Sequence, residues 1–221
     1  MQRLDAKITA LGFPEEYKGT MREKAMEAET GYFHLYYKTE FNSVPVEVAL
    51  GFQEMHKGSR YFEPDLMSVQ LGARSENVVD RNLFYLPTGA DVSIREAFNL
   101  IQGRAVRVES GIPGDQAYWI RLNADKEFNG IRSPYVVKGH LNVGAWMRGT
   151  PLNKMYNMEE KAAIARSLEH GDRFLVDRGK AGKVFLEANP EKDKVEIKNE
   201  RGKMVRVSQL EDQAQSMHRK R

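Results

Sequence analysis

Cysteine is absent from the 221 residues, so the chain forms no disulfide and offers no thiolate to a metal ion. No apolar stretch approaches the roughly 18 residues that a membrane-spanning helix needs. The first seven residues also lack the basic and then apolar pattern of a secretory signal. We therefore expect a cytoplasmic protein that has no contact with a membrane.

A strong charge of one sign is also missing. The formal net charge is +3 at pH 7, which is too small to identify a partner. From residue 151 onward there are 16 Lys and Arg against 12 Asp and Glu, a net +4, so the first 150 residues carry a net −1. The basic tail at 218–221 supplies much of this excess. Such tails attract nucleic acid, although a solvated terminus that aids solubility is the plainer interpretation.

Motifs that would indicate an enzyme or a metal site are lacking as well. The five histidines have neither His-x-His nor His-Glu-x-x-His spacing, and no Gly-x-Ser-x-Gly turn is present. We therefore expect no metal, no cofactor and no catalytic residue. An enzyme would require carboxylates or histidines from distant segments to converge in one pocket.

The chain does contain an internal repeat. Segment 93–126 has a helical pattern ending at Gly103, then a strand, a loop, and a second strand that closes on Asn-x-x-Lys. Segment 159–192 repeats this order with Gly171 at the matching position and a shorter loop. Asn123 and Asn189 occupy matching positions and both suit a turn. The shared residues are explained by structure and need no chemical role.

The sequence Arg-Leu-Asn-Ala-Asp-Lys at 121–126, after the helix, glycine and strand, resembles an uncharacterised domain family. That family occurs in proteins of bacterial conjugative elements, notably those of Bacteroidetes. The resemblance covers the middle copy of the repeat and, more weakly, the C-terminal copy. It implies no catalytic residue; it implies a cytoplasmic accessory protein of mobile DNA.

Four Ser/Thr/Asn-x-x-Glu capping boxes indicate where helices begin, because the first side chain accepts a free amide of the helix and the glutamate reaches back. They start at Thr20, Ser93, Asn157 and Ser208, and a further helix is expected over 2–11. The helix after Thr20 is expected over 21–30, with Gly31 as its left-handed cap.

Strict alternation of apolar residues predicts strands over 44–52, 67–71 and 141–147, with shorter strands at 32–37 and 83–86. Pro45 lacks an amide donor, which favours a sheet edge at the start of its strand. The expected fold is α+β, with short helices packed on antiparallel β-meanders. We expect a divergent N-terminal part at 1–86, one repeat unit at 87–150 and a second at 151–221.

A glycine-rich turn over 177–184 concentrates positive charge. It fails as a phosphate-binding Walker loop, because Asp177 and Val184 stand where that motif needs Gly and Ser or Thr. Its cations are still candidates for phosphate contacts, the alternative being an ordinary solvated turn. The candidate nucleic-acid-binding residues, including the tail, are Arg178, Lys180, Lys183, Arg219, Lys220 and Arg221.

The aromatic run at 32–37 offers a second candidate surface. Alternation places Tyr32, His34 and Tyr36 on one face of a strand and Phe33, Leu35 and Tyr37 on the other. One face must belong to the core, and the other could stack bases. The leading hypothesis is a non-enzymatic protein that contacts nucleic acid. A protein–protein adaptor that uses strand edges or the aromatic strand is the alternative.

Overall fold

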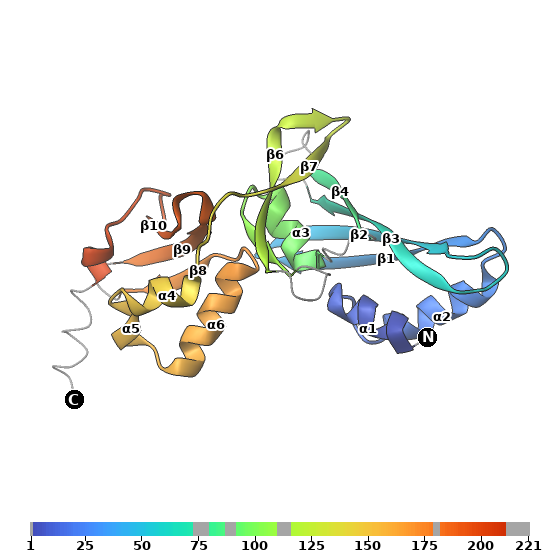
Figure 1. Ribbon diagram of the computed structural model, residues 1–221, viewed down its shortest axis with the longest axis horizontal. Helices are drawn as coiled ribbons and strands as arrows, with labels where there is room; N and C mark the ends of the chain where they lie inside the picture. The colour runs from blue at the N-terminus through green and yellow to red at the C-terminus, as the bar shows by residue number, and fades with distance from the viewer. Residues whose placement is uncertain (1, 73–79, 87–91, 110–115, 179–181, 211–221) are drawn as a thin grey trace. The chain divides into compact units, whose positions relative to one another are not determined.

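A computed structural model describes residues 2–72, 80–86, 92–109, 116–178 and 182–210 (Figure 1). Within them, helices accompany three antiparallel sheets, which confirms the predicted α+β class. The chain divides into two compact units. Unit 1 comprises 1–102, 108–117 and 122–134, and unit 2 comprises 103–107, 118–121 and 135–221. None of the described helices combines the length and the apolar character needed to cross a bilayer.

Unit 1 is built on a four-stranded meander in the order β1-β2-β3-β4. Helices α1 and α2 lie along one face of this sheet (Figure 1), and α3 packs on β3 and β4. The elements are α1 (Gln2–Ala10), α2 (Tyr17–Glu27), β1 (Tyr32–Phe41), β2 (Val44–Glu54), β3 (Phe62–Leu71), β4 (Arg81–Tyr85) and α3 (Ile94–Ile101).

The predicted alternation in β2 is confirmed, because Val46, Val48 and Leu50 are all buried on the helix side. β2 as a whole lies between β1 and β3. Its first two residues, Val44 and Pro45, pair with β1 alone, so the strand begins at an edge as predicted. Pro45 is tolerated because pairing with β3 begins only at Val46, and the proline carbonyl accepts a hydrogen bond from Gly72 at 2.7 Å.

A β-bulge in β3 allows side chains on both sides of the bulge to point into the core. The pairing shifts between Gly51 and Phe52 of β2, so Asp65 is an extra residue on β3. Because of it, Pro64 before the bulge and Met67 after it are both buried. Without the extra residue, the pleat would turn one end of the strand to solvent.

Two of the four capping boxes are confirmed. Ser93 and Asn157 each accept a hydrogen bond from the amide of the glutamate three residues later, and that glutamate bonds back to the cap amide. Gly103 and Gly171 follow the ends of these helices with φ of +78° and +82°, as a left-handed cap requires. Both copies of the repeat therefore share this helix and its glycine.

The box at Thr20 is wrong, since α2 begins a turn earlier, at Tyr17. The Tyr17 ring packs against Phe13 at 5.7 Å and against Tyr37 at 5.3 Å between ring centroids. Thr20 therefore lies inside the helix, whose first residue is held by these ring contacts. Ser208 lies within a short 3-10 turn at Val207–Leu210. The rest of the helix predicted from Ser208 lies outside the described residues.

A third sheet has the order β5-β6-β7, formed by β5 (Val106–Val108), β6 (Tyr118–Phe128) and β7 (Ile131–Val136), and the division between the units falls within its strands. Asn123 lies inside β6, so no turn forms there, although its side-chain oxygen accepts a hydrogen bond from the Asp125 amide at 3.0 Å, as expected of a turn asparagine. Its partner in the repeat, Asn189, does end a strand. The division into 1–86, 87–150 and 151–221 stays a prediction. The two compact units show which segments pack together, but they do not test whether the segments arose by duplication.

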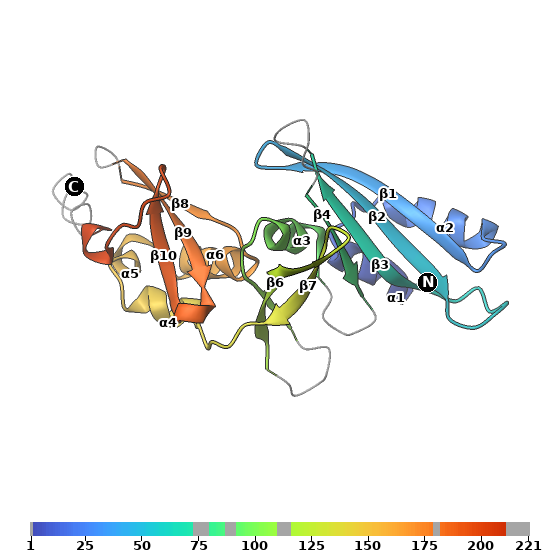
Figure 2. The same ribbon diagram turned by 90° about the horizontal axis from the view of Figure 1, so that it is seen from above.

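Unit 2 places helices on one face of the sheet β10-β9-β8 (Figure 2). Helix α4 packs on β10, and α6 packs on β8 and β9. Trp119, Leu168 and Leu186 lie in its buried core. The elements are α4 (Val143–Arg148), α5 (Leu152–Met155), α6 (Met158–Glu169), β8 (Phe174–Asp177), β9 (Lys183–Asn189), a 3-10 turn (Pro190–Lys192) and β10 (Lys194–Asn199).

The strand expected at 141–147 is a helix. Asn142 caps it by accepting a hydrogen bond from the Ala145 amide at 2.8 Å. Val143 and Met147 are buried four residues apart. A spacing of four satisfies both a strand and a helix, so alternation over so short a run could not distinguish them.

Gly139 lies so close to the Pro190–Lys192 turn that a Cβ there would stand 1.9 Å from the Pro190 carbonyl oxygen. We expect Gly139→Ala to lower the free energy of unfolding of unit 2 by about 1–3 kcal/mol, since backbone must move to make room. Both tryptophans, Trp119 and Trp146, lie in unit 2, so their fluorescence during urea denaturation reports on this unit.

Gly144→Ala is the matched control. A Cβ at this helical position would make only an ordinary 3.5 Å contact with Asn142. The replacement should leave stability unchanged or raise it by up to about 1 kcal/mol, the usual helix preference for Ala over Gly. Equal midpoints for the two variants would show that the close approach at Gly139 is not a constraint.

Candidate functional site

The predicted phosphate-binding cations are only partly within the described residues. Lys180, Arg219, Lys220 and Arg221 lie outside them. Lys183 is exposed at the start of β9, where it pairs in register with Asp177 of β8. The two residues lie directly opposite each other, so their side chains are on the same face of the hairpin.

Arg178 is half-buried, and its amide donates to the Gly182 carbonyl at 3.0 Å across the same turn. The structure thus brings Arg178 and Lys183 to one hairpin, as expected. The two described cations alone do not make a basic surface, because one is half-buried and the other faces a carboxylate. Their role in phosphate contact stays a prediction.

The aromatic strand gives a clearer surface. Phe33 and Leu35 are buried on the helix side of β1, whereas Tyr32 and Tyr36 are 36% and 67% exposed. The face that alternates with the buried one is here called the open face. Its residues in register are Tyr32, His34, Tyr36, Lys38, Glu47, Ala49, Gly51, Gln53, Glu63, Leu66, Ser68, Gln70, Arg81, Leu83 and Tyr85.

Three rings form a row along β1. The Tyr32 and His34 ring centroids are 4.8 Å apart with the rings edge to face, and those of His34 and Tyr36 are 5.9 Å apart with nearly parallel planes. Side chains two residues apart in a strand point to the same side, which explains the row. The row presents aromatic area to solvent on the side away from the core.

Gly51 of β2 determines how Tyr32 lies. A Cβ at position 51 would be 2.2 Å from the Tyr32 hydroxyl oxygen and 3.0 Å from its Cζ, so the ring extends across the strand beside it. Burial raises the pKa of the Tyr32 hydroxyl, and the nearby Asp65 and Tyr36 add to this effect. Tyr32 therefore stays a neutral phenol at pH 7.

The open face is close to neutral near these rings. The Lys38 ammonium lies 2.5 Å from the Glu47 carboxylate on the neighbouring strand. Asp65 lies near the Tyr32 hydroxyl. A ligand that binds here would gain more from stacking than from charge.

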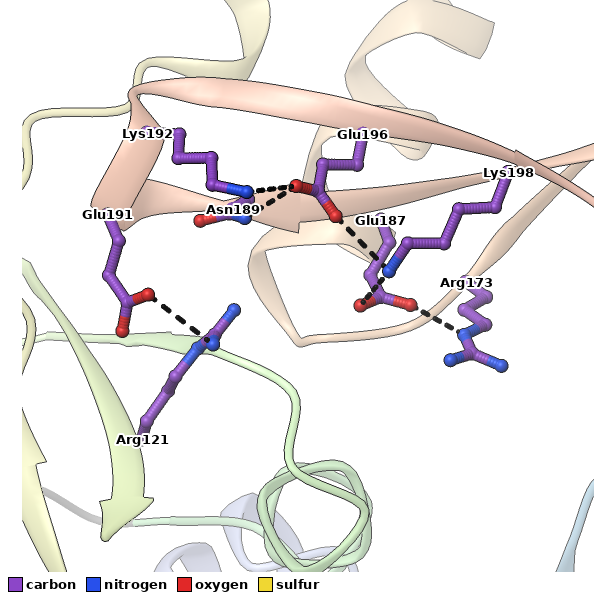
Figure 3. A network of polar contacts seen from close by, with 8 residues as sticks. All are labelled: Arg121, Arg173, Glu187, Asn189, Glu191, Lys192, Glu196 and Lys198. Atoms are coloured by element: carbon purple, nitrogen blue, oxygen red, sulfur yellow. Dashed lines mark hydrogen bonds and ion pairs between the residues drawn. The ribbon is translucent and has the colours of Figure 1, made fainter. Parts of the chain in front are cut away.

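The open side of the unit 2 sheet is different, because its polar groups are bound to one another (Figure 3). Glu187 and Glu196 lie directly opposite each other on β9 and β10. The Lys198 ammonium lies between them, 3.0 Å from Glu187 and 3.2 Å from Glu196. It relieves the repulsion between two facing carboxylates.

Further donors complete this network. The Arg173 Nε donates to Glu187 at 2.7 Å. Glu196 accepts from the Asn189 amide nitrogen at 2.8 Å and from the Lys192 ammonium at 3.2 Å. Sequence analysis missed the network, although the hairpin register across the Asn-Pro turn would have placed the two glutamates opposite each other.

Burial opposes the charge of Glu196 and would raise its pKa, but hydrogen bonds from Asn189, Lys192 and Lys198 outweigh this and lower the pKa to about 2. Burial likewise opposes the charge of Glu187, and its bonds to Arg173 and Lys198 still lower its pKa. Both pKa values are lowered below the ordinary 4.5, whereas proton transfer is most efficient for a group whose pKa lies near the working pH.

The folded pKa of Glu196 lies below its ordinary 4.5, so its contribution to stability is complete above pH 4.5 and is lost as pH falls toward 2. We expect the tryptophan-detected unfolding free energy to drop by up to about 3 kcal/mol between pH 6 and pH 2 from this group alone. Glu196→Gln should flatten that pH dependence. A variant whose pH profile parallels the wild type would refute this assignment.

Within the described residues, no group of three His, Asp or Glu side chains is placed to hold a metal ion. Comparison with known proteins adds no assignment: no protein-family model matches the chain, and no curated protein or solved structure is significantly similar to it. The resemblance to a family of conjugative elements therefore stays a prediction.

Proposed function

We propose that the protein is a non-enzymatic binding protein that holds single-stranded nucleic acid against the open face of unit 1. Tyr32, His34 and Tyr36 stack on the bases. The exposed row of rings is the observation that carries the proposal, since every base has a π-face and stacking on aromatic side chains tolerates any sequence. Four-stranded sheets with surface aromatics bind RNA in this manner.

Phosphate contacts would come from elsewhere in the chain. The candidates are the cations predicted above, at the unit 2 hairpin and in the C-terminal tail. The proposed setting is the cytoplasm, in association with a mobile genetic element. This setting rests on the family resemblance and not on the geometry.

Binding of a fluorescently labelled single-stranded oligonucleotide, measured by anisotropy at about 50 mM salt, tests the proposal. Tyr36→Ala should weaken binding about tenfold or more, because stacking of one base is worth about 1–3 kcal/mol. Tyr61→Ala is the matched control, since Tyr61 is also exposed but lies in the β2–β3 loop, with its hydroxyl bonded to Glu63 at 2.9 Å. No detectable binding of DNA or RNA would end the proposal.

Gly51→Ala is a second test of the same surface, because it changes the position of the Tyr32 ring. The new methyl would collide with the far end of the Tyr32 side chain, so the ring must move while the strand stays in place. We expect weaker oligonucleotide binding with little loss of stability. Unchanged affinity in this variant would remove Tyr32 from the proposed surface.

The salt series separates stacking from charge. Binding to single strands falls with salt by a log–log slope of about −0.7 for each phosphate neutralised. If the open face dominates, the slope should be no steeper than about −0.7, the value for one phosphate, since Lys38 is paired with Glu47. A slope several times steeper, abolished by deleting residues 211–221, would instead assign the binding to the basic tail.

A protein–protein adaptor is the second candidate, and the near-neutral charge of the open face favours it. Tyrosine is enriched at protein interfaces, where charged residues are depleted at the core. In a pull-down from the native host, a stoichiometric protein retained by the wild type and lost with Tyr36→Ala, without nucleic acid, would support this candidate.

A further inference from the structure

Strand β1 forms one edge of the unit 1 sheet (Figure 2), and β2 is its sole neighbour among the described strands. Its ten residues make it about twice as long as a usual strand. Edge strands are commonly shortened, or interrupted by proline or a β-bulge, so that no other chain can pair with them. β1 has neither interruption, because its register with β2 runs unbroken from Tyr32 to Phe41. Its edge is therefore open to a further strand.

Every second residue of β1 points its backbone N–H and C=O to this edge. Gly31 and Glu54 continue the β1–β2 register by one pair, and the Glu54 amide donates to the Gly31 carbonyl at 2.8 Å. At the other end, Phe41 and Val44 close a two-residue turn of positive φ, as a hydrogen-bonded pair does. Bonded and non-bonded pairs alternate in an antiparallel ladder, so the odd-numbered residues bond to β2 and the even-numbered ones face outward.

Most of these outward groups have no partner. The Tyr32 carbonyl accepts a hydrogen bond from the Thr30 hydroxyl at 3.2 Å. No other described residue bonds to the outward backbone groups of β1, which belong to His34, Tyr36, Lys38 and Glu40. The opposite edge of the sheet is partly capped, because the Leu83 carbonyl of β4 accepts the Asn82 side chain at 3.2 Å. The edge of β1 thus offers the longer row of donors and acceptors.

We propose that a second copy of this chain pairs with β1 in the antiparallel direction and joins the two four-stranded sheets into one. A two-fold axis passes beside Tyr37, so that Tyr37 lies opposite Tyr37 of the second copy and residues 33–41 of both copies overlap. The outward groups of each copy then meet those of the other, as an antiparallel ladder requires. Pairing through identical surfaces is the usual arrangement of a two-fold dimer.

The side chains on the open face favour this register. His34 comes opposite Glu40 of the second copy, where the imidazole can donate to the carboxylate. Lys38 comes opposite Tyr36, where an ammonium group and an aromatic ring attract each other. Symmetry makes each of these pairs twice. Moving the second copy by two residues in one direction would place Lys38 opposite Lys38, and in the other direction it would place His34 opposite Lys38. Both movements lose the two favourable pairs.

The helix side of β1 supplies apolar contacts in the same register. Tyr37 and Phe41 are only half-buried in the single chain, although both lie on the side that faces the core. In the dimer the two Tyr37 side chains are neighbours, and Phe33 lies opposite Phe41 of the second copy. Pairing would therefore cover aromatic area that unit 1 leaves partly exposed, which favours association.

The dimer does not rest on the proposed binding of nucleic acid, but it would enlarge that surface. The two-fold axis is perpendicular to the joined sheet, so both open faces lie on one side of it. Tyr32, His34 and Tyr36 of the second copy would then adjoin the row of rings in the first. Each copy thus contributes rings to one continuous aromatic surface.

The mass of the full chain, measured without nucleic acid by sedimentation over a range of concentrations, tests the dimer. A single edge gives a small interface, and we expect a transient dimer with a dissociation constant of about 10 μM. The mass should rise from 25.3 kDa at about 1 μM toward twice that value at about 200 μM. A chain that stays monomeric at about 200 μM would overturn the proposal.

Hydrogen exchange of the wild type locates the interface. The amides of His34, Tyr36, Lys38 and Glu40 should exchange about fivefold more slowly at about 200 μM than at about 1 μM, because most of the protein is then dimeric. Segment 81–85, at the other edge of the sheet, is the control and should exchange equally at both concentrations. Slowing at 81–85 without slowing at 32–41 would show that β1 is not the interface.

Lys38→Pro removes one outward amide from each copy. This amide makes no bond within the sheet, so an edge proline is compatible with the folded unit. Lys38→Ala is the matched control, since it keeps the amide and loses the same side chain. We expect Lys38→Ala to raise the dissociation constant by about fivefold at most, and Lys38→Pro to raise it at least about tenfold further. Circular dichroism at low concentration checks that both variants fold. Equal constants for the two would exclude this amide from the interface and refute the pairing.

The dimer and the nucleic-acid surface can fail separately. A monomer that still binds the oligonucleotide through Tyr36 would refute only the dimer. A dimer paired through β1 that binds neither DNA nor RNA would refute only the proposed function.

Discussion

The pleat of the β-strand is the constraint on which the rest of this structure depends. Each unit buries one face of a sheet against helices, and successive side chains of a strand point to opposite faces. Packing Phe33 and Leu35 into the core therefore obliges Tyr32, His34 and Tyr36 to lie on the other side. The exposed aromatic row follows from the position of the core and not from a separate folding preference.

The two units use their open sides differently. In unit 2, Glu187 and Glu196 face each other and are held by Lys198, Lys192 and Arg173, so the charged groups satisfy one another. In unit 1, the rings contact one another along one strand and leave aromatic area toward solvent. A self-contained network stabilises the sheet that carries it, whereas exposed rings gain most when a partner covers them. This difference makes the open face of unit 1 the better candidate for a binding surface.

Two glycines allow close approaches that any side chain would block. Gly51 lets Tyr32 extend over the neighbouring strand, and Gly139 lets backbone approach the Pro190 carbonyl. Neither glycine has a positive φ, so neither is needed for its backbone angles. Each is needed because a single carbon atom would collide with a group that is remote in sequence. The sequence shows that a glycine occupies each position, but it does not show which distant group lies next to that glycine in the fold.

Local signals in the sequence determined the α+β class, the alternating strands, the capping boxes at Ser93 and Asn157, and the two possible faces of the aromatic strand. These features depend on residues at most a few positions apart, which is why they could be predicted. Only the tertiary structure decided which face was buried, that 143–148 is a helix, and where α2 begins. It also assembled the glutamate network. Those features join residues far apart in the chain, and their free energy comes from burial and contact, which exist only once the chain has folded.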